Sequence, residues 1–353
     1  MISIISPLLL GSYLRQEPLL PTEGNMEPEI GIVLDGLASW DQNAGIGTNL
    51  RMLEISASSV VDPFGRAHAI VEFPGLEEVE IAEAVFVFSE PSEDWEIRAG
   101  RLLLDFGKWN TVHLHDLPVM REDPVRTGLL GGRLAGTGIE FHRWLGVGDT
   151  PLRFSLGAFS DFGTHGHSSG SHEHGNHGGL ISGTSGATSL QDWGFSGRIT
   201  AQHDWGSNGW LQWGLSGFTT SQGLTSSYED ASAKEQTVYG LNSKTWAADF
   251  TFRRASINSA EWSMGSLEYW SHSAEQAHFD GALAIERPGL NGLWGIFEQG
   301  TSREWSRGIH GGGWEVFEDD QNQFARRVGL HLNRHLSESQ RLRFGVDYGR
   351  DDP

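Results

Sequence analysis

The sequence has no cysteine, which excludes thiol catalysis, zinc–thiolate sites, iron–sulfur clusters and disulfides. Basic residues are also scarce: 25 Lys and Arg stand against 46 Asp and Glu, and the formal net charge is −21. Because nucleic-acid binding depends on neutralising phosphates with a basic surface, a nucleic-acid partner is excluded. No uninterrupted stretch of 18 apolar residues occurs, so no transmembrane helix is expected. A membrane β-barrel is still compatible, because only half of each of its strands is apolar.

Short segments that alternate apolar and polar residues recur along the chain, separated by clusters of Gly, Asp, Asn and Ser. This period of two is typical of β-strands with two different faces, and no segment has a convincing helical period with caps. We expect one face of these strands to carry Trp193, Phe195, Ile199, Leu211, Trp213, Leu215, Phe250, Phe252, Leu342, Phe344 and Val346. We expect the opposite face to carry Arg198, Gln212, Asp249, Arg253, Arg343 and Asp347. The chain is therefore predicted to be all-β.

Segment length and aromatic placement decide between a soluble β-sandwich and a membrane barrel. Most segments approach the about 9–11 residues that a strand needs to cross a membrane, against about 5–6 in soluble proteins. Tryptophans such as Trp40, Trp95 and Trp144 lie at segment ends, where a barrel has its aromatic girdles. We therefore predict a transmembrane, antiparallel, up-and-down β-barrel whose apolar face contacts outer-membrane lipid. At about 20 to 25 residues per strand with its loop, the barrel has roughly 14 to 16 strands and encloses a water-filled channel.

The barrel is expected to form a single domain over residues 26–350. Residues 1–25 are interpreted as an N-terminal segment, either a signal remnant or a periplasmic extension, because no basic residue precedes their apolar run. Residues 163–190 are expected to form a His-, Gly- and Ser-rich extracellular loop. Residues 107–132 lack clean alternation and contain Pro118 and Pro124, so we expect them to fold into the lumen as a loop.

Residues 50–145 carry a family resemblance. The matching features are Asp62, Pro63, Arg66, Glu78, Ala82, Arg98, Gly100, Phe106, Gly107, Asn110, His113, His115 and Pro124. On these residues the chain resembles the porin-like outer-membrane barrels of Gram-negative bacteria that are described as zinc-regulated or metal-associated. These barrels are similar in layout to phosphate-selective and other substrate-specific porins. The resemblance implies a Gram-negative outer-membrane location, a porin barrel and, by analogy with porins, a homotrimer as a candidate assembly.

A histidine-rich stretch is the clearest candidate for chemistry. Residues 163–179 read GTHGHSSGSHEHGNHGG and hold five of the 15 histidines of the chain. The candidate metal ligands are His165, His167, His172, His174, His177 and Glu173. Imidazole suits zinc, copper and nickel, and a Gly/Ser backbone lets several rings converge on one ion. We predict transient capture of Zn(II) and no firmly bound cofactor; the alternative is a solvated loop without metal.

His113 and His115 form a second candidate metal pair. Residues two apart in an extended segment face the same side, so both rings could share one ion. The alternative is that hydrogen bonds from the two rings only position the loop. If this loop narrows the lumen, its polar side chains set selectivity. The predicted pore-lining residues are Asp105, Lys108, Asn110, Asp116, Arg198, Asp249, Arg253, Arg343 and Asp347.

Three functions fit these features. The first is a channel for small hydrophilic solutes or ions, divalent metal ions included. The second is a non-conducting surface barrel that displays a metal-binding or adhesive loop, and the third is a barrel hydrolase. The channel is favoured because barrels of this size enclose water. The stretch GHSSG at 166–170 matches a hydrolase motif, but no helix is expected after it as that motif requires. No enzymatic activity is therefore predicted.

Overall fold

The computed structural model describes residues 2–5, 28–41, 45–76, 79–89, 94–148, 150–165, 189–229, 234–256, 259–279, 281–317, 324–337 and 340–352. His165 is the last residue of a strand in this part of the chain. The whole GHSSG motif at 166–170 lies outside the described residues. The other candidate ligands of the histidine-rich stretch also lie outside them: His167, His172, Glu173, His174 and His177. No helix in the described ranges is long and apolar enough to cross a membrane.

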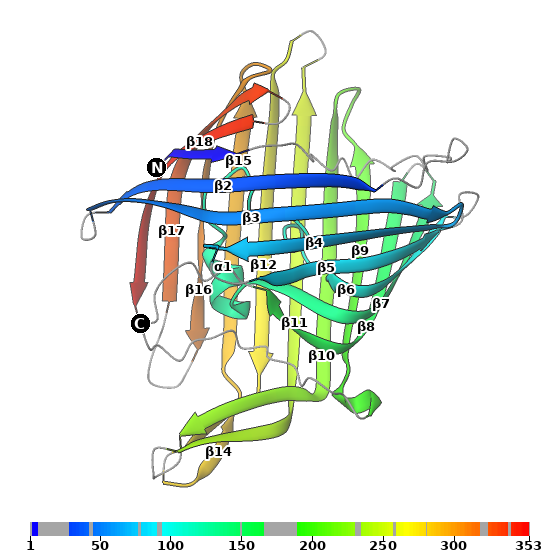
Figure 1. Ribbon diagram of the computed structural model, residues 1–353, viewed down its shortest axis with the longest axis vertical. Helices are drawn as coiled ribbons and strands as arrows, with labels where there is room; N and C mark the ends of the chain where they lie inside the picture. Colours follow the sequence, from blue (N-terminus) through cyan, green and yellow to red (C-terminus); the bar gives the residue numbers. More distant parts are fainter. Residues whose placement is uncertain are drawn as a thin grey trace.

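The protein is a closed barrel of antiparallel strands (Figure 1). The barrel strands are β1 (Ile2–Ile5), β2 (Glu29–Asp41), β3 (Gly45–Asp62), β4 (Gly65–Pro74), β5 (Glu80–Ser89), β6 (Trp95–Leu103), β7 (Arg133–Val147), β8 (Thr150–His165), β9 (Gly194–Asp204), β10 (Gly209–Glu229), β11 (Glu235–Ala255), β12 (Trp262–Ala274), β15 (Gly289–Gly300), β16 (Trp305–Phe317), β17 (Phe324–Ser337) and β18 (Gln340–Asp352). Within the described ranges, these sixteen strands follow one another around the barrel in chain order. The prediction of an all-β, up-and-down barrel of roughly 14 to 16 strands is confirmed.

One hairpin interrupts the chain order of the barrel. β12 pairs with β15, and the residues between them form β13 (Gln276–Phe279) and β14 (Leu283–Glu286), a separate two-stranded sheet. The hairpin packs on the end of β10, where the Ala277 N–H donates to Ser226 Oγ at 2.9 Å and the ring of Phe279 stacks on Tyr228. Figure 1 shows this extension at the lower end of the barrel.

The two sides of the barrel wall differ in polarity, because successive side chains of a strand point to opposite sides. The outer side carries Phe195, Leu215 and Phe250, which are 42%, 50% and 43% exposed. The inner side carries Arg198 and Asp249, which are 6% and 4% exposed. Charged residues inside and apolar residues outside reverse the arrangement of a soluble protein. The strands are also tilted, as barrel closure requires, so β2–β5 cross in front of β10–β12 in Figure 1.

The first strand differs from the sequence-based expectation. Ile2–Ile5 belong to the segment 1–25 that was interpreted as lying outside the barrel, whereas they form β1 and pair with both β18 and β2. Without β1, each of these two neighbours would present a row of unpaired backbone N–H and C=O groups at an open edge. Pairing on both sides of β1 satisfies these groups and closes the barrel.

The segment between β6 and β7, residues 104–132, lies inside the barrel, and we call it the inner loop. It contacts side chains of β3, β8, β10, β12, β17 and β18, which are strands from all around the wall. Its apolar residues Leu104, Phe106 and Trp109 pack with Trp270 of the wall in a buried cluster. The apolar core of the molecule therefore lies within the barrel, around this loop.

The inner loop contains a short helix, α1 (Pro124–Leu130), that the periodicity did not predict. Seven residues are too few to establish a period of 3.6. Local residues account for the helix: Asp123 caps its start by accepting from the Arg126 N–H at 2.6 Å, and Pro124 fits the first turn. Gly131 ends it in the left-handed region, with φ 75°. The helix packs against β15, β16 and β17. A second short helix, η1 (Leu190–Asp192), precedes β9.

Candidate functional site

The inner loop is fixed at its root by one buried amide. Asn110 Nδ2 donates to the carbonyl oxygens of Leu104 and Leu134 at 2.8 and 2.9 Å. Its Oδ1 accepts from the Leu134 N–H at 2.7 Å, which ties the loop to the start of β7. Each buried backbone group left without a partner costs about 1–3 kcal/mol, so this amide strongly favours the inward position of the loop.

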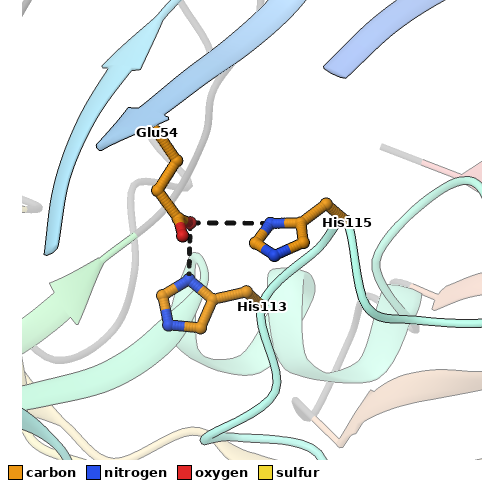
Figure 2. Close-up of side chains that lie close together, drawn as sticks. All are labelled: Glu54, His113 and His115. Carbon is orange, nitrogen blue, oxygen red and sulfur yellow. Dashed lines mark ion pairs between the residues drawn. The ribbon is translucent and has the colours of Figure 1, made fainter. Parts of the chain in front are cut away.

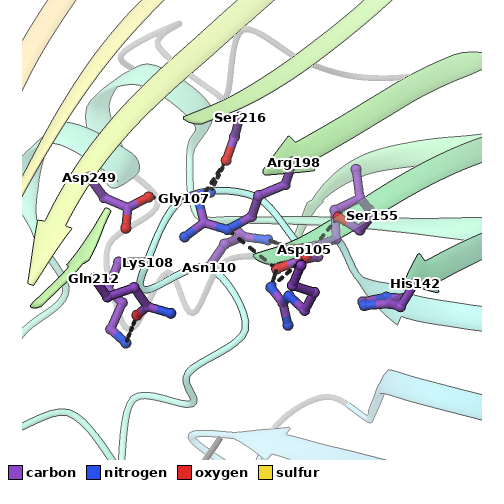
Figure 3. Close-up of polar contacts among 12 residues, drawn as sticks. Asp105, Gly107, Lys108, Asn110, His142, Ser155, Arg198, Gln212, Ser216 and Asp249 are labelled. Carbon is purple, nitrogen blue, oxygen red and sulfur yellow. Dashed lines mark hydrogen bonds and ion pairs between the residues drawn. The ribbon is translucent and has the colours of Figure 1, made fainter. Parts of the chain in front are cut away.

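A cluster of charges joins the start of the inner loop to the wall (Figure 3). Both carboxylate oxygens of Asp105 accept from Arg153 Nη2 at 2.7 Å, and Asp105 Oδ2 also accepts from Ser155 Oγ at 2.7 Å. Arg198 lies between two acids: its Nε is 3.6 Å from Asp105 Oδ1, and its Nη1 donates to Asp249 Oδ2 at 2.7 Å. Burial acts to raise the pKa of Asp105, but Arg153 and Arg198 outweigh it and lower this pKa to about 2.

Lys108 extends this cluster toward β10 and β12. Its Nζ donates to Gln212 Oε1 at 3.3 Å, and its backbone N–H donates to Glu268 Oε1 at 2.6 Å. The preceding Gly107 donates its N–H to Ser216 Oγ at 3.0 Å. A side chain does not fit at Gly107, since φ is 63° and an added Cβ would lie 2.0 Å from Glu268 Oε1. Burial lowers the pKa of Lys108 to about 8, which places its charge change near neutral pH.

A second cluster connects the middle of the inner loop with β3 and β4 (Figure 2). His113 Nδ1 lies 3.1 Å from Glu54 Oε2 and 3.1 Å from Glu72 Oε1. His115 Nδ1 lies 3.5 Å from the same Glu54 oxygen, and Arg133 Nη2 donates to Glu72 Oε1 at 3.1 Å. Burial and Arg133 act to lower the pKa of His113, but the two carboxylates outweigh them and raise it to about 9.

Arg343 of β18 holds the far side of the inner loop. Its Nη1 donates to the carbonyl oxygens of Leu114, Leu117 and Val119 at 3.0, 2.9 and 2.9 Å. Its Nη2 lies 3.4 Å from Asp35 Oδ2 on β2. One fully buried guanidinium thus holds three backbone carbonyls of residues 114–119 to the wall at the β18–β2 side of the barrel.

The remaining predicted pore-lining residues lie at the edges of these clusters or beyond them. Asp116 Oδ2 is 3.5 Å from His115 Nε2, and burial raises the pKa of Asp116. Asp347 Oδ1 is 2.8 Å from His310 Nε2, and its charge also interacts with that of Arg121 in the inner loop. Arg253 is exposed toward the end of β11. The structure therefore gathers most of the predicted residues around the inner loop and leaves Arg253 apart from it.

Five charged residues of the two clusters were absent from the sequence-based prediction: Glu54, Glu72, Arg133, Arg153 and Glu268. All five are on strands, where they face the barrel interior. The available signal was their position on the inner side of otherwise apolar segments such as MLEIS and IVEFP. That signal is weak, because any lumen-facing residue of a barrel strand shares it.

A closed barrel of sixteen antiparallel strands, with charged inner faces and a loop folded into its interior, has the architecture of a porin. No known family model matches the sequence, and no curated protein is significantly similar to it.

Solved structures match the fold along almost the whole chain. Outer-membrane-expressed OmpT of Vibrio cholerae is similar with a TM-score of 0.55 and 8% identity, over 93% of this chain and 89% of that one. A trimer form of in-vitro folded OmpT, an outer membrane protein of Vibrio cholerae, matches with a TM-score of 0.53 and 8% identity, over 99% and 89%. An anion-selective porin from Comamonas acidovorans matches with a TM-score of 0.51 and 9% identity, over 99% of both chains. At such low identity, the likeness establishes the porin fold.

Proposed function

We propose that the protein is an outer-membrane channel of the porin type, which passes small hydrophilic solutes or ions. The closed sixteen-stranded barrel with its charged interior is the observation that carries this proposal. Barrels of about 16–18 strands enclose an aqueous channel, whereas barrels of about eight are filled by their own side chains. The inner loop, with fixed charges on both of its sides, is then the element that selects among solutes.

The outer surface of the barrel supports a location in lipid. Apolar side chains such as Ile30 and Leu215 are 69% and 50% exposed on it, and soluble proteins rarely expose large contiguous apolar patches. Trp40, Trp144 and Trp205 lie exposed at or next to strand ends, where an indole is stable at the boundary of a bilayer. The Vibrio cholerae neighbours are outer membrane proteins, which supports a Gram-negative outer membrane as this location.

The connections between strands support an orientation. Because antiparallel strands alternate in direction, the connections β6–β7, β8–β9 and β12–β15 all leave the same end of the barrel. Most connections at the opposite end are short, among them 148–149, 205–208, 256–261 and 301–304, and the connection 6–28 is the exception. Outer-membrane barrels have short periplasmic turns and longer extracellular loops. We therefore place the histidine-rich loop between β8 and β9 on the extracellular side.

This loop is proposed to capture Zn(II) at the mouth of the channel. The support is its composition, five histidines and one glutamate in residues 163–179 on a Gly/Ser backbone. A homotrimer is the proposed assembly, supported by the trimer form of the Vibrio cholerae neighbour.

Single-channel recording in a planar lipid bilayer tests the channel. The purified protein should produce discrete, stable open levels in KCl, and a heat-unfolded sample of the same preparation should produce none. A folded preparation that inserts into the bilayer without any open level would contradict the proposal. It would favour the second candidate, a non-conducting barrel that only displays its loops.

A further inference from the structure

We propose that Glu54, His113 and His115 form a divalent metal site inside the barrel, of the kind that binds Zn(II). The site joins β3 to the inner loop, so a bound ion fixes the loop against the wall. It is distinct from the histidine-rich loop, and its existence does not depend on conduction. Figure 2 shows the three side chains converging on one point, the carboxylate from the strand and both rings from the loop.

The geometry suits a zinc ion. One ligand atom from each of Glu54, His113 and His115 lies within 4.8 Å of the other two. Glu54 Oε2 is 3.1 Å from His113 Nδ1 and 3.5 Å from His115 Nδ1. Zinc bonds to nitrogen and oxygen of about 2.0–2.2 Å place tetrahedral ligands about 3.3–3.6 Å apart, which is close to both of these distances.

Two of the three ligand atoms lack a hydrogen bond within the described residues. Glu54 and His115 are 4% and 6% exposed, and neither Glu54 Oε2 nor His115 Nδ1 has a hydrogen-bond partner there. The carboxylate pairs with His113 at 3.1 Å, whereas the buried His115 Nδ1, 3.5 Å from the same oxygen, has no described group that donates to it or accepts from it. A divalent ion that replaces the proton between Glu54 and His113 bonds to all three atoms.

The surroundings favour a cation and select its type. Asp116 lies on the far side of His115, where its Oδ2 is 3.5 Å from Nε2, an arrangement that orients the ring of a metal-bound histidine. The charge of Arg133 acts on His113, but Arg133 also donates to both oxygens of Glu72 at 3.1 and 3.4 Å. Two imidazoles with one carboxylate suit zinc, copper or nickel, whereas calcium and magnesium prefer oxygen ligands throughout.

Zinc titration of the folded barrel in detergent tests the site. The background for every measurement is a variant with His165, His167, His172, His174 and His177 all changed to Ser, which removes the other candidate ligands. Isothermal calorimetry with ZnCl2 should show one equivalent per chain, and CaCl2 should show none. No zinc binding in this background would overturn the proposal and would leave the channel proposal untouched.

Two further variants assign the ligands. Glu54→Gln preserves the shape of the side chain but removes its charge, and it should weaken zinc binding more than about 100-fold, beyond the loss typical of groups that only orient ligands. His115→Gln should have a similar effect, which keeps the test decisive if one variant does not fold. Glu140→Gln is the matched control, because Glu140 is also a buried strand carboxylate but pairs with a different histidine, His142 at 2.7 Å. It should bind zinc like the background.

Amide hydrogen exchange gives a second measurement, because an adventitious ion bound elsewhere would not slow exchange in the inner loop. In the background variant, zinc should slow exchange of amides in the inner loop around His113 and His115, because the ion ties them to β3. In Glu54→Gln, zinc should leave this exchange unchanged. Full zinc affinity in both the Glu54→Gln and His115→Gln variants would overturn the assignment of these ligands.

Discussion

At the scale of single residues, the interior of the barrel is a set of opposed charges with fixed positions. Arg198 lies between Asp105 and Asp249, and Arg133 is held by Glu72. Removing one member of such a buried pair typically lowers the free energy of unfolding by about 3–5 kcal/mol, because the remaining buried charge loses its partner. Each charge is therefore held in a defined position, and the inner loop lies within a fixed electrostatic pattern.

Lys108 gives this pattern a pH dependence. It lies near the acids Asp249 and Glu268 and near the bases Arg198 and Arg153, and burial lowers its pKa to about 8. Lys108 is thus charged below this pH and neutral above it. Between about pH 7 and about pH 9, the reversal potential in a KCl gradient should shift toward cation selectivity, as one positive charge is lost.

Two variants at this position separate charge from size. Lys108→Met should remove the shift and keep the cation-favouring value throughout. Lys108→Arg stays charged across the whole range and should keep the value of the parent at about pH 7. If the shift persists unchanged in Lys108→Met, another group is responsible for it.

At the scale of elements, each strand has a side toward lipid and a side toward the lumen. Leu215 is 50% exposed on the outer face of β10 and pairs with Ile199 in the middle of β9. Leu215→Arg should lower the free energy of unfolding by about 2–4 kcal/mol, because a charge then faces the middle of the bilayer. Urea unfolding in lipid vesicles, followed by tryptophan fluorescence, measures this loss.

Gln202→Arg is the control for this substitution. Gln202 lies on β9, on the same side of the strand as Arg198 and therefore toward the lumen, and it is only half-buried. The new charge can remain hydrated there, so the loss of stability should be much smaller. Equal losses for the two variants would contradict the assignment of the two faces.

The elements also show what a sequence can predict. Alternation is a local property, so it predicts the strands, the all-β class and the approximate strand number. Pro118 and broken alternation indicate that 107–132 is not a strand, but they do not indicate α1. The partners of His113 are less accessible still, since Glu72 is 41 residues away. The pairing of each histidine ring with a side chain of β3 or β4 depends on strand register and on the path of the loop through the lumen. Neither of these leaves a pattern in the local sequence.

At the scale of the whole molecule, the two histidine features occupy different places. His113 and His115 lie within the barrel, where burial and strand contacts fix them. The histidine-rich stretch begins in the last residues of β8, at the end of the barrel that also has the β6–β7 and β12–β15 connections. A backbone rich in Gly and Ser loses much conformational entropy when it closes around an ion, so we expect this loop to bind zinc more weakly than a site built on the wall.

The histidine-rich loop is tested on the whole protein. Changing His165, His167, His172, His174 and His177 together to Ser should abolish the weaker class of zinc binding in calorimetry. Folding stability should stay within about 0.5 kcal/mol of the parent, because substitutions away from the core and its networks have small effects. Urea unfolding of parent and variant in the same detergent measures this difference.

The control replaces Ser168, Ser169 and Ser171 of the same loop by Ala, which leaves every histidine in place and should leave zinc binding intact. An identical zinc isotherm in parent and five-serine variant would show that the loop captures no zinc and that the metal chemistry of this barrel lies in its interior.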